Sequence, residues 1–409
     1  MEKYPLKIII AGHVDHGKST LIGRILLATH SLPAEKIAEI QKISRELGKD
    51  TEIAYISDQL KEERENNLTI DTTQAFFKTR KRKYVIIDAP GHVEFIKNMI
   101  SGATLAQTGI LIVDAKEGIQ EQTKRHAYLF HLLGLEKWIV AINKMDMVNY
   151  EESCFNSIKS HLLEFFARIP ASPYAVVPVS ARAGENIIQK SSYMKWYKQG
   201  SLLSILDGIA MESKKKEECL RLPIQDIYES SGEKMLVGRI SYGTIRKGQK
   251  ILLLPDRLEA TVKEVKIFQK KVKMAREKEN IGLILKEDLP WKRGQILVQK
   301  ENAPEARCSF QGNLFWLSDR PLVLNKPFML RCATQEIEST SVKIKERRNS
   351  STLDLLEEEA SSLQKNETGI VYFQTKEPVL VEKFSQIPEL GRFIIEDNFA
   401  IEGTGIVCE

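Results

Sequence analysis

Short apolar runs alternate with amphipathic stretches along the first half of the chain. Between the apolar runs, hydrophobic residues recur at helical spacing, as at 34–47 and 120–133, and each of these stretches ends just before a glycine. Strands that alternate with helices in this way predict an α/β fold, in which helices wrap a mostly parallel sheet. The predicted strands, each apolar enough to be buried on both faces, lie at 6–11, 84–88, 109–114, 138–143 and 175–179.

The pattern changes after a highly charged segment at 212–218, which we interpret as a linker. From there on, short alternating runs separated by glycine predict two small antiparallel β-barrels. We therefore predict an α/β domain at 1–211 and β-barrel domains at 212–302 and 303–409. The barrel runs lie at 235–241, 250–254, 260–268, 282–286 and 295–299, and then at 312–317, 328–333, 340–345, 368–374 and 392–396.

Composition is that of an ordinary globular protein, with 42% hydrophobic and 28% charged residues among 409 and a net charge of only +5. This charge is too small to indicate nucleic-acid binding by itself, and we interpret the basic clusters at 78–83 and 266–278 as solvated faces of strand pairs. No apolar run approaches the ~18 residues of a membrane span, and the first residues lack a signal peptide's apolar region. We expect a cytoplasmic protein without a membrane partner. The five scattered cysteines indicate reduced thiols.

The segment after the first predicted strand fits the phosphate-binding pattern G-x-x-x-x-G-K-[ST], and a helix is expected to follow it. Its glycines let backbone N–H groups face a polyphosphate, while Lys18 reaches the outer phosphates and Ser19 is placed to hold Mg²⁺. We interpret the two histidines as parts of this loop, since no third metal ligand lies nearby. The predicted nucleotide-binding residues are Gly12, His13, Val14, Asp15, His16, Gly17, Lys18, Ser19 and Thr20.

A second motif follows the predicted strand at 138–143, at the sheet edge where ligands bind in open α/β folds. It consists of Asn143, Lys144, Met145 and Asp146. The Asp146 carboxylate can accept hydrogen bonds from N1 and the 2-amino group of guanine, which adenine cannot match. Ser180 and Ala181, at the end of the next predicted strand, are expected to close over the guanine oxygen. Together the two motifs predict GTP as the nucleotide.

A third motif ends the predicted strand at 84–88 and consists of Asp88, Ala89, Pro90, Gly91 and His92. Asp88 is expected to hold Mg²⁺ through a water, and the Gly91 N–H to sense the γ-phosphate. His92 is best placed to orient the attacking water, so we predict that it is catalytic. Thr69, in the segment before this strand, is the candidate for the remaining Mg²⁺ ligand.

These motifs, in this order and spacing, resemble those of the translation-factor class of GTPases. The class includes elongation factors Tu and 1-alpha and the GTPase subunit of bacterial heterodimeric sulfate adenylyltransferase. The resemblance covers nearly the whole chain and implies a GTPase domain followed by two β-barrels. It also implies that His92 promotes hydrolysis behind an apolar gate formed by Val14 and Leu68. The class pattern Arg-Glu-x-Gly-Ile-Thr is altered here, with Asn67 and Leu68 in place of Gly and Ile.

Within this class, the chain combines features of two branches. A Gly-Tyr-x-Pro stretch that is common in the third domain of elongation factors is absent, since no tyrosine lies between Tyr242 and Tyr372. His13, His16 and the segment 390–393 instead resemble the elongation factors. The stretches that resemble the sulfate adenylyltransferase subunit lie at 194–200 with 202–203, at 221–226, at 314–322, and at 352–353 with 363–369.

The resemblance therefore implies a GTP-driven partner of a separate catalytic adenylyltransferase subunit, which would bind ATP and sulfate. Two alternatives stay open. One is an elongation factor that carries aminoacyl-tRNA, and the other is a regulatory GTPase with a different partner. A nucleic acid, namely tRNA, is a partner only under the first alternative.

Overall fold

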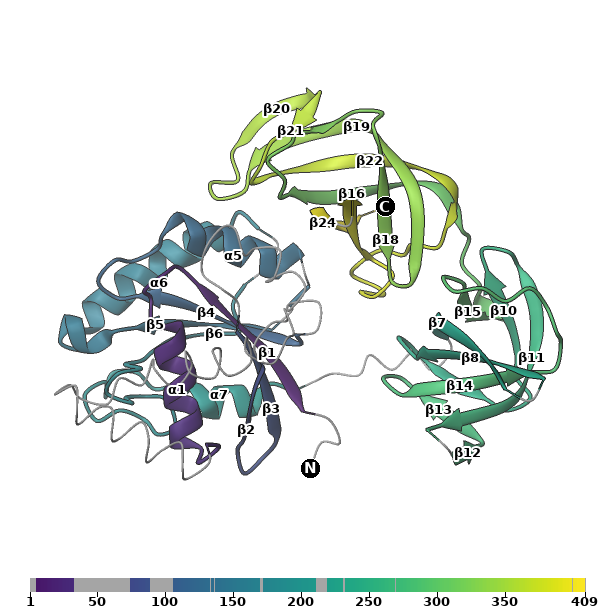
Figure 1. Ribbon diagram of the computed structural model, residues 1–409. Coiled ribbons are helices and arrows are strands. Elements are labelled where there is room, and N and C mark those ends of the chain that lie inside the picture. Colours follow the sequence, from purple (N-terminus) through teal and green to yellow (C-terminus); the bar gives the residue numbers. More distant parts are fainter. Residues whose placement is uncertain are drawn as a thin grey trace. The chain divides into compact units, whose positions relative to one another are not determined.

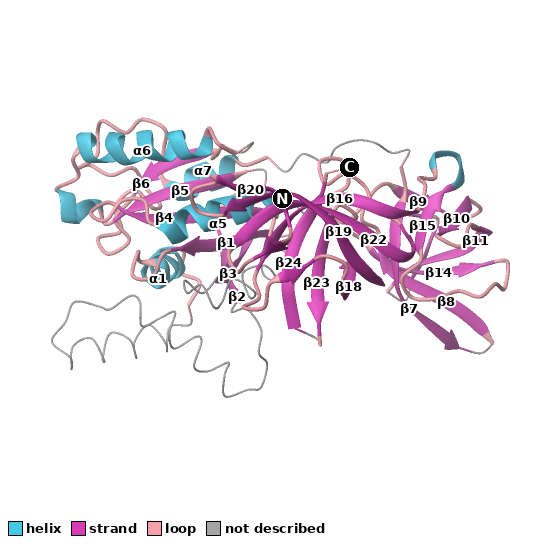
Figure 2. Ribbon diagram, turned by 90° about the horizontal axis from the view of Figure 1, so that it is seen from above, coloured by secondary structure: helices cyan, strands magenta, loops and turns pink. Residues whose placement is uncertain are grey.

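The computed structural model describes residues 5–32, 74–88, 106–132, 134–135, 137–169, 172–210, 219–230, 232–268, 270–398 and 400–408. The chain divides into two compact units, Met1–Met211 with Ser350–Leu353, and Glu212–Asn349 with Asp354–Glu409. In the described part of the chain, α-helices belong to the first unit, whereas the second is built almost entirely from strands (Figure 2). The helix expected at 34–47 and the linker expected at 212–218 lie outside the described residues.

A mostly parallel sheet forms the core of the first unit, with the described strands in the order β2-β3-β1-β4-β5-β6. Among the described strands of this sheet, only β2 runs antiparallel to its neighbour, β3. The five predicted strands are confirmed to within a residue at each end, and β2 supplies the second strand of the pair that was expected around 78–83. The strands are β1 (Leu6–Gly12), β2 (Gln74–Lys78), β3 (Lys83–Asp88), β4 (Thr108–Asp114), β5 (Trp138–Asn143) and β6 (Ala175–Pro178).

Helices cover both faces of this sheet. The helices α1 (Lys18–Ala28) and α7 (Leu202–Gly208) lie on one side, and α5 (Glu121–Leu132) and α6 (Glu152–Phe166) on the other (Figure 1). Because both faces are covered, the central strands are apolar along their length, and every residue of β4 and β5 is buried. Parallel strands end at one edge of a sheet, so the segments after β1, β3, β4, β5 and β6 converge there.

The first part of the second unit is an antiparallel barrel with the described strand order β10-β15-β7-β8-β14-β11, closed by pairing of β10 with β11. Alternate side chains, such as Leu222 and Ile224, fill its interior. The strand β12 extends the sheet at β11, and β9 and β13 form a separate ribbon. The strands are β7 (Arg221–Ser230), β8 (Glu233–Arg239), β9 (Thr244–Arg246), β10 (Lys250–Leu254), β11 (Leu258–Ile267), β12 (Lys270–Val272), β13 (Met274–Arg276), β14 (Asn280–Leu285) and β15 (Ile296–Gln299).

The second part is another antiparallel barrel, with the described order β18-β23-β24-β16-β22-β19, closed by pairing of β18 with β19. Its core contains the rings of Phe310, Phe373 and Phe393, with centroids 5.0 to 5.5 Å apart. The short helix η3 (Lys300–Asn302) precedes this barrel. Its strands are β16 (Arg307–Trp316), β17 (Leu322–Val323), β18 (Pro327–Cys332), β19 (Gln335–Asn349), β20 (Leu355–Ala360), β21 (Ser362–Leu363), β22 (Glu367–Val379), β23 (Arg392–Asp397) and β24 (Ala400–Val407). The predicted fold class, an α/β domain followed by two antiparallel barrels, is confirmed, while the domain boundaries stay a prediction.

The two barrels contact each other through ion pairs and an apolar cluster, and the pair of Arg221 with Glu382 is more buried than that of Arg293 with Glu336. Arg221, which begins β7, donates from Nε to Oε2 of Glu382 at 2.6 Å and from Nη2 to Oε1 at 2.9 Å, and it is only 4% exposed. A bidentate pair of this kind is strong because both hydrogen bonds are charge-assisted. The cluster beside it joins Leu252, Leu254, Ile296 and Val298 of the first barrel to Leu380, Ile387 and Leu390 of the second.

One charge prediction is wrong in part. Of the basic residues at 78–83, Arg82 is buried, whereas the others are exposed. The guanidinium of Arg82 donates from Nη1 to the Ile209 carbonyl at 3.0 Å. Asp207 of α7 also accepts hydrogen bonds from Thr79 at 2.8 Å and from the Tyr84 hydroxyl at 2.5 Å. The turn between β2 and β3 is thus tied to the end of α7, which a linear charge pattern does not reveal.

In the described part of the chain, no helix is both long and apolar enough to cross a membrane.

Candidate nucleotide-binding site

The turn between β1 and α1 has the backbone that a phosphate loop needs. Gly17, just before α1, has a φ of 93°, in the left-handed region that favours glycine, and a Cβ there would lie 2.4 Å from Nδ2 of Asn143. A Cβ on Gly12 would lie 2.6 Å from a carbonyl oxygen of β4. Lys18 folds back and donates from Nζ to the Gly12 and His13 carbonyls, both at 2.8 Å. Its amine therefore lies over the loop that a polyphosphate would occupy.

The two histidines of this loop anchor it to the neighbouring elements. Nδ1 of His13 lies 2.5 Å from Oε1 of Gln122 on α5. His16 is fully buried, with Nε2 3.3 Å from Oε2 of Glu117, and its Nδ1 accepts the Asp114 N–H at 3.3 Å. Burial, aided by the charge of His13, lowers the pKa of His16. His16 is thus held as a neutral ring that fixes the loop in place.

Asn143 joins the predicted base-binding motif to the phosphate loop. It ends β5 and is 2% exposed. Its Nδ2 donates to the His16 carbonyl at 2.9 Å, and its Oδ1 accepts the Ala181 N–H at 2.9 Å. One side chain therefore sets the spacing between the phosphate loop and both segments predicted to bind guanine.

Lys144 and Asp146 contact different partners. Lys144, with a left-handed φ of 61°, places Nζ 2.6 Å from Oδ2 of Asp114. Burial alone raises the pKa of Asp114, but the hydrogen bond from Lys144 and the N–H of Lys116 bring it below its ordinary value. Oδ1 of Asp146 accepts the Ser180 hydroxyl at 2.5 Å, whereas Oδ2 has no partner among the described residues. That carboxylate can therefore still accept from a base.

The loop after β6 was expected to meet the guanine oxygen through Ser180 and Ala181. The Ala181 N–H, however, is already donated to Asn143, and the Ser180 hydroxyl donates to Asp146 while accepting the Ala183 N–H at 3.1 Å. The next backbone donor, the Arg182 N–H, has no partner within the described residues. The loop thus offers Arg182 as a donor that the sequence analysis did not name.

The predicted Mg²⁺ ligands are described in part. Ser19 and Thr20 lie half-buried in the first turn of α1, and Asp88 ends β3 with 7% exposure. Hydroxyl and carboxylate oxygens are ligands that Mg²⁺ takes, so Ser19 and Asp88 fit such an ion. Val14 and Asp15 complete the phosphate loop, Asp15 with a left-handed φ of 61°. Outside the described residues lie Asn67, Leu68, Thr69, Ala89, Pro90, Gly91 and His92.

Comparison with known proteins identifies the family. Residues 3–222 match the elongation factor Tu GTP binding domain, and residues 309–408 match the GTP-eEF1A C-terminal domain-like family. This chain belongs to the translation-factor GTPases. Elongation factor 1-alpha of Pyrococcus furiosus is 34% identical over 99% of this chain and 98% of its own length. That of Archaeoglobus fulgidus is 35% identical, over 100% and 98%. A solved structure of sup35 complexed with GDP aligns over 100% of this chain and 94% of that chain, with 23% identity and a TM-score of 0.47.

Sequence reasoning missed several residues that support the GTP site of this translation-factor GTPase. Asp114 ends a predicted strand at the ligand-binding edge, and this position was a signal for its contact with Lys144. Gln122 and Glu117 lie beyond that strand, and nothing in the local pattern marks them as contacts of the phosphate loop. Nothing in the local pattern marks Arg24 either, because the residues it contacts lie 157 and 158 positions further along the chain.

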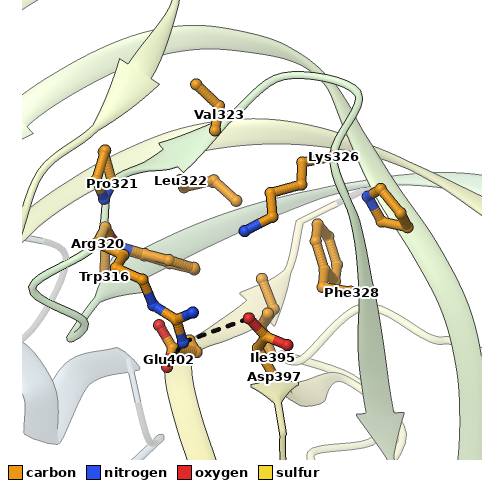
Figure 3. Close-up of a pocket in the computed structure, with 11 residues that line it drawn as sticks. Trp316, Arg320, Pro321, Leu322, Val323, Lys326, Phe328, Ile395, Asp397 and Glu402 are labelled. Carbon is orange, nitrogen blue, oxygen red and sulfur yellow. Dashed lines mark hydrogen bonds and ion pairs between the residues drawn. The ribbon is translucent and has the colours of Figure 1, made fainter.

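A separate hollow lies on the last barrel of this translation-factor GTPase, where the chain bends between β16 and β17 (Figure 3). The Trp316 ring is buried, and its Nε1 donates to the Arg320 carbonyl at 2.7 Å. Arg320 forms ion pairs with Asp397 at 3.3 Å and with Glu402 at 3.2 Å. Lys326 extends into the hollow from the other side and has no ion-pair partner among the described residues.

Proposed function

We propose that this chain is the GTP-hydrolysing subunit that drives a sulfate adenylyltransferase. In this proposal a separate catalytic subunit makes adenylyl sulfate and pyrophosphate from ATP and sulfate. The proposal rests on the stretches that resemble such a subunit, and one structural observation carries it. Two of these stretches, 314–322 and 363–369, meet on the last barrel.

A hydrogen bond and a strand pair join the stretches 314–322 and 363–369. The Asn366 N–H donates to the Trp316 carbonyl at 2.9 Å, and Leu322 pairs with Leu363 in the ribbon formed by β17 and β21. The hollow lined by Trp316 lies at the same place. A surface assembled from two distant stretches that share one resemblance supports a docking site for one partner.

In the proposed reaction the first unit binds and hydrolyses GTP. Ser19 would hold Mg²⁺ directly and Asp88 would hold it through a water, and the ion would supply positive charge against the phosphates. Lys18 would exchange its own loop carbonyls for the outer phosphates. His92, predicted from the sequence, would orient a water whose oxygen attacks the γ-phosphorus as the bond to the β–γ bridging oxygen breaks.

Coupling of the two reactions has a thermodynamic reason. Adenylylation of sulfate is unfavourable, so it advances if its steps are gated by GTP hydrolysis. The sequence predicts that loops containing Thr69 and Gly91 contact the γ-phosphate. A partner that contacts those loops binds the GTP and GDP states with different affinity, which is how hydrolysis would change the complex.

An elongation factor that delivers aminoacyl-tRNA is the second candidate. It is favoured by relatives that are named elongation factor 1-alpha and that match almost the whole chain at 34% identity. The missing Gly-Tyr-x-Pro stretch of the third domain favours the first proposal instead.

A reconstituted assay distinguishes the two candidates. The purified chain is mixed with an adenylyltransferase subunit, and adenylyl sulfate formation is measured with GTP, with GDP and with a non-hydrolysable GTP analogue. We expect stimulation by GTP alone, and GTP hydrolysis stimulated in turn by ATP and sulfate. In parallel, the chain with GTP should not protect aminoacyl-tRNA from deacylation. Strong protection of the ester with no effect of GTP on adenylyl sulfate synthesis would reverse the choice.

A pair of charge reversals tests the docking surface. Lys365 lies 2.6 Å from Asp319, in an exposed ion pair that links the two stretches. Lys376 forms a similar exposed pair with Glu338 elsewhere in the same barrel. Lys365→Glu should reduce stimulation by the partner while GTP binding stays unchanged, and Lys376→Glu should have no effect. Equal effects of the two variants would argue against this surface.

A further inference from the structure

We propose that Arg24 is a specificity-determining positioning residue, which holds the loop after β6 so that its backbone contacts the oxygen at C6 of guanine. The proposal concerns nucleotide binding by the chain alone. It rests on the guanine-nucleotide site and not on the identity of the partner.

The side chain of Arg24 connects α1 to the loop after β6. Nε donates to the Ala181 carbonyl at 3.0 Å, and Nη2 donates to the Arg182 carbonyl. The planar fork of a guanidinium presents donors in a fixed geometry, so two successive carbonyls are held at once. The helix that begins at Lys18 of the phosphate loop is thereby attached directly to the loop predicted to cover the base.

The stem of Arg24 packs closely on the same loop. A Cβ on Gly184, which has a left-handed φ of 81°, would lie 3.5 Å from both Cδ and Nε of Arg24. The loop is closed by the Gly184 N–H, which donates to the Ser180 carbonyl at 2.8 Å, and by pairing of Ser180 with Glu185. Arg24 therefore contacts a loop that already has a defined turn, and it fixes how that turn faces α1.

The charge of Arg24 is not balanced by a carboxylate. Among the described residues it forms no ion pair, and it lies half-buried against carbonyl groups. Burying a charge without a counter-ion costs free energy, and partial burial lowers the pKa of Arg24. A cation held at that cost, with its donors directed at backbone carbonyls, fits a role in positioning the backbone.

The geometry of the peptide bond gives the consequence. In a planar trans peptide the N–H points opposite to the C=O. Because Arg24 holds the Ala181 carbonyl toward α1, the N–H of the same peptide group, that of Arg182, points away from α1. The Ala181 N–H is already donated to Asn143, whereas the Arg182 N–H has no partner in the described part of the chain. It is therefore a backbone donor of this loop that is available to a carbonyl on the base.

The affinities for three nucleotides distinguish this positioning role from a general structural role of Arg24. GTP and inosine triphosphate carry the oxygen at C6, and 2-aminopurine riboside triphosphate lacks it. Arg24→Ala should weaken GTP and inosine triphosphate by about tenfold each, the size of one hydrogen bond, and should change the 2-aminopurine nucleotide less than about twofold. Affinities are measured by titration of the purified chain. The matched control is Arg80→Ala, an exposed arginine of the same unit in the turn between β2 and β3.

The outcomes are distinguishable. If Arg24→Ala loses affinity equally for all three nucleotides, or loses no affinity for GTP, the proposed role of Arg24 is wrong. If Arg24→Ala does not fold, as judged by circular dichroism, Arg24→Lys gives the test. This variant keeps the stem and the charge but not the fork, so the same selective pattern is expected with a smaller loss. If the wild-type chain itself does not bind GTP more tightly than the 2-aminopurine nucleotide, the assignment of a guanine-specific site is wrong. A negative result in the adenylyltransferase assay would not bear on the proposed role of Arg24, because this role concerns nucleotide binding by the chain alone.

Discussion

The amine of Lys144 lies 2.6 Å from the carboxylate of Asp114, so the guanine motif after β5 is held by the end of β4. Asp114 is 2% exposed and also accepts the N–H groups of Lys116 at 2.7 Å and Glu117 at 3.3 Å. Lys144 has the left-handed φ of 61° that a non-glycine residue rarely adopts. The ion pair stabilises this backbone and with it the position of Asp146.

Asp114→Asn keeps an acceptor for the two N–H groups but removes the charge that faces Lys144. We expect the free energy of unfolding to fall by about 2 kcal/mol, since a buried hydrogen bond to a charged group is lost. GTP affinity should fall as well, because Lys144 loses its anchor. Urea unfolding and GTP titration measure the two effects. Asp288→Asn, which removes an exposed pair with Lys234, is the control, and an equal effect there would contradict the prediction.

Asp146→Asn should change the preferred base from guanine to xanthine. The asparagine amide can donate to the oxygen at C2 of xanthine but cannot accept both guanine donors as the carboxylate does. The lost charge-assisted hydrogen bonds are worth about 2 to 4 kcal/mol, which is roughly a 30- to 1,000-fold loss of GTP affinity. Titration with GTP and with xanthosine triphosphate tests the change. Unchanged GTP affinity would rule out Asp146 as the base reader.

His92→Ala should separate binding from hydrolysis. His92 lies outside the described residues, and its role is predicted from its place after Gly91 in the sequence. The substitution leaves Lys18, Ser19 and Asp146 in place, so GTP should bind as before. Partner-stimulated hydrolysis should fall by about 10²-fold or more, measured as phosphate release under single-turnover conditions. Hydrolysis at the wild-type rate would assign the catalytic role to another residue.

His126 should make the stability of the protein depend on pH. It lies on α5 with 2% exposure, and its Nδ1 has no hydrogen-bond partner among the described residues. Burial, with the nearby positive charge of Lys18, lowers its pKa from 6.5 to about 3. Between these values the unfolded chain binds one more proton than the folded chain. The free energy of unfolding therefore falls as the pH falls through this window, by up to about 1.4 kcal/mol per pH unit.

His126→Gln removes this titration. We expect its free energy of unfolding, measured in urea at several pH values between 6.5 and 4.5, to fall less steeply than that of the wild type. His161→Gln, an exposed histidine on α6, should follow the wild-type curve. Parallel curves for His126→Gln and the wild type would show that His126 does not titrate in this window.

The sequence predicted those parts of the site that depend on local order. Each motif follows an apolar run, and parallel strands end at one edge, so Lys18, Asn143 and Ser180 were expected near one another. Contacts that depend on how side chains pack across elements were not predictable. Arg24 lies in an ordinary amphipathic helix, and Arg82 lies in a run of basic residues that predicts a solvent-exposed face. In both cases the partner is a backbone carbonyl more than a hundred residues away, and a carbonyl leaves no signal in the sequence.

The first described strand of the second unit begins at Arg221, the residue paired with Glu382. A tension applied to the chain where it enters this unit is therefore divided between the two barrels at the first strand residue. One route to the last barrel is the side chain of Arg221, which does not cross the sheet of the barrel before it. The last barrel, which carries the proposed docking surface, is in this sense mechanically adjacent to residues 219–220 although about eighty residues of sequence intervene before it begins.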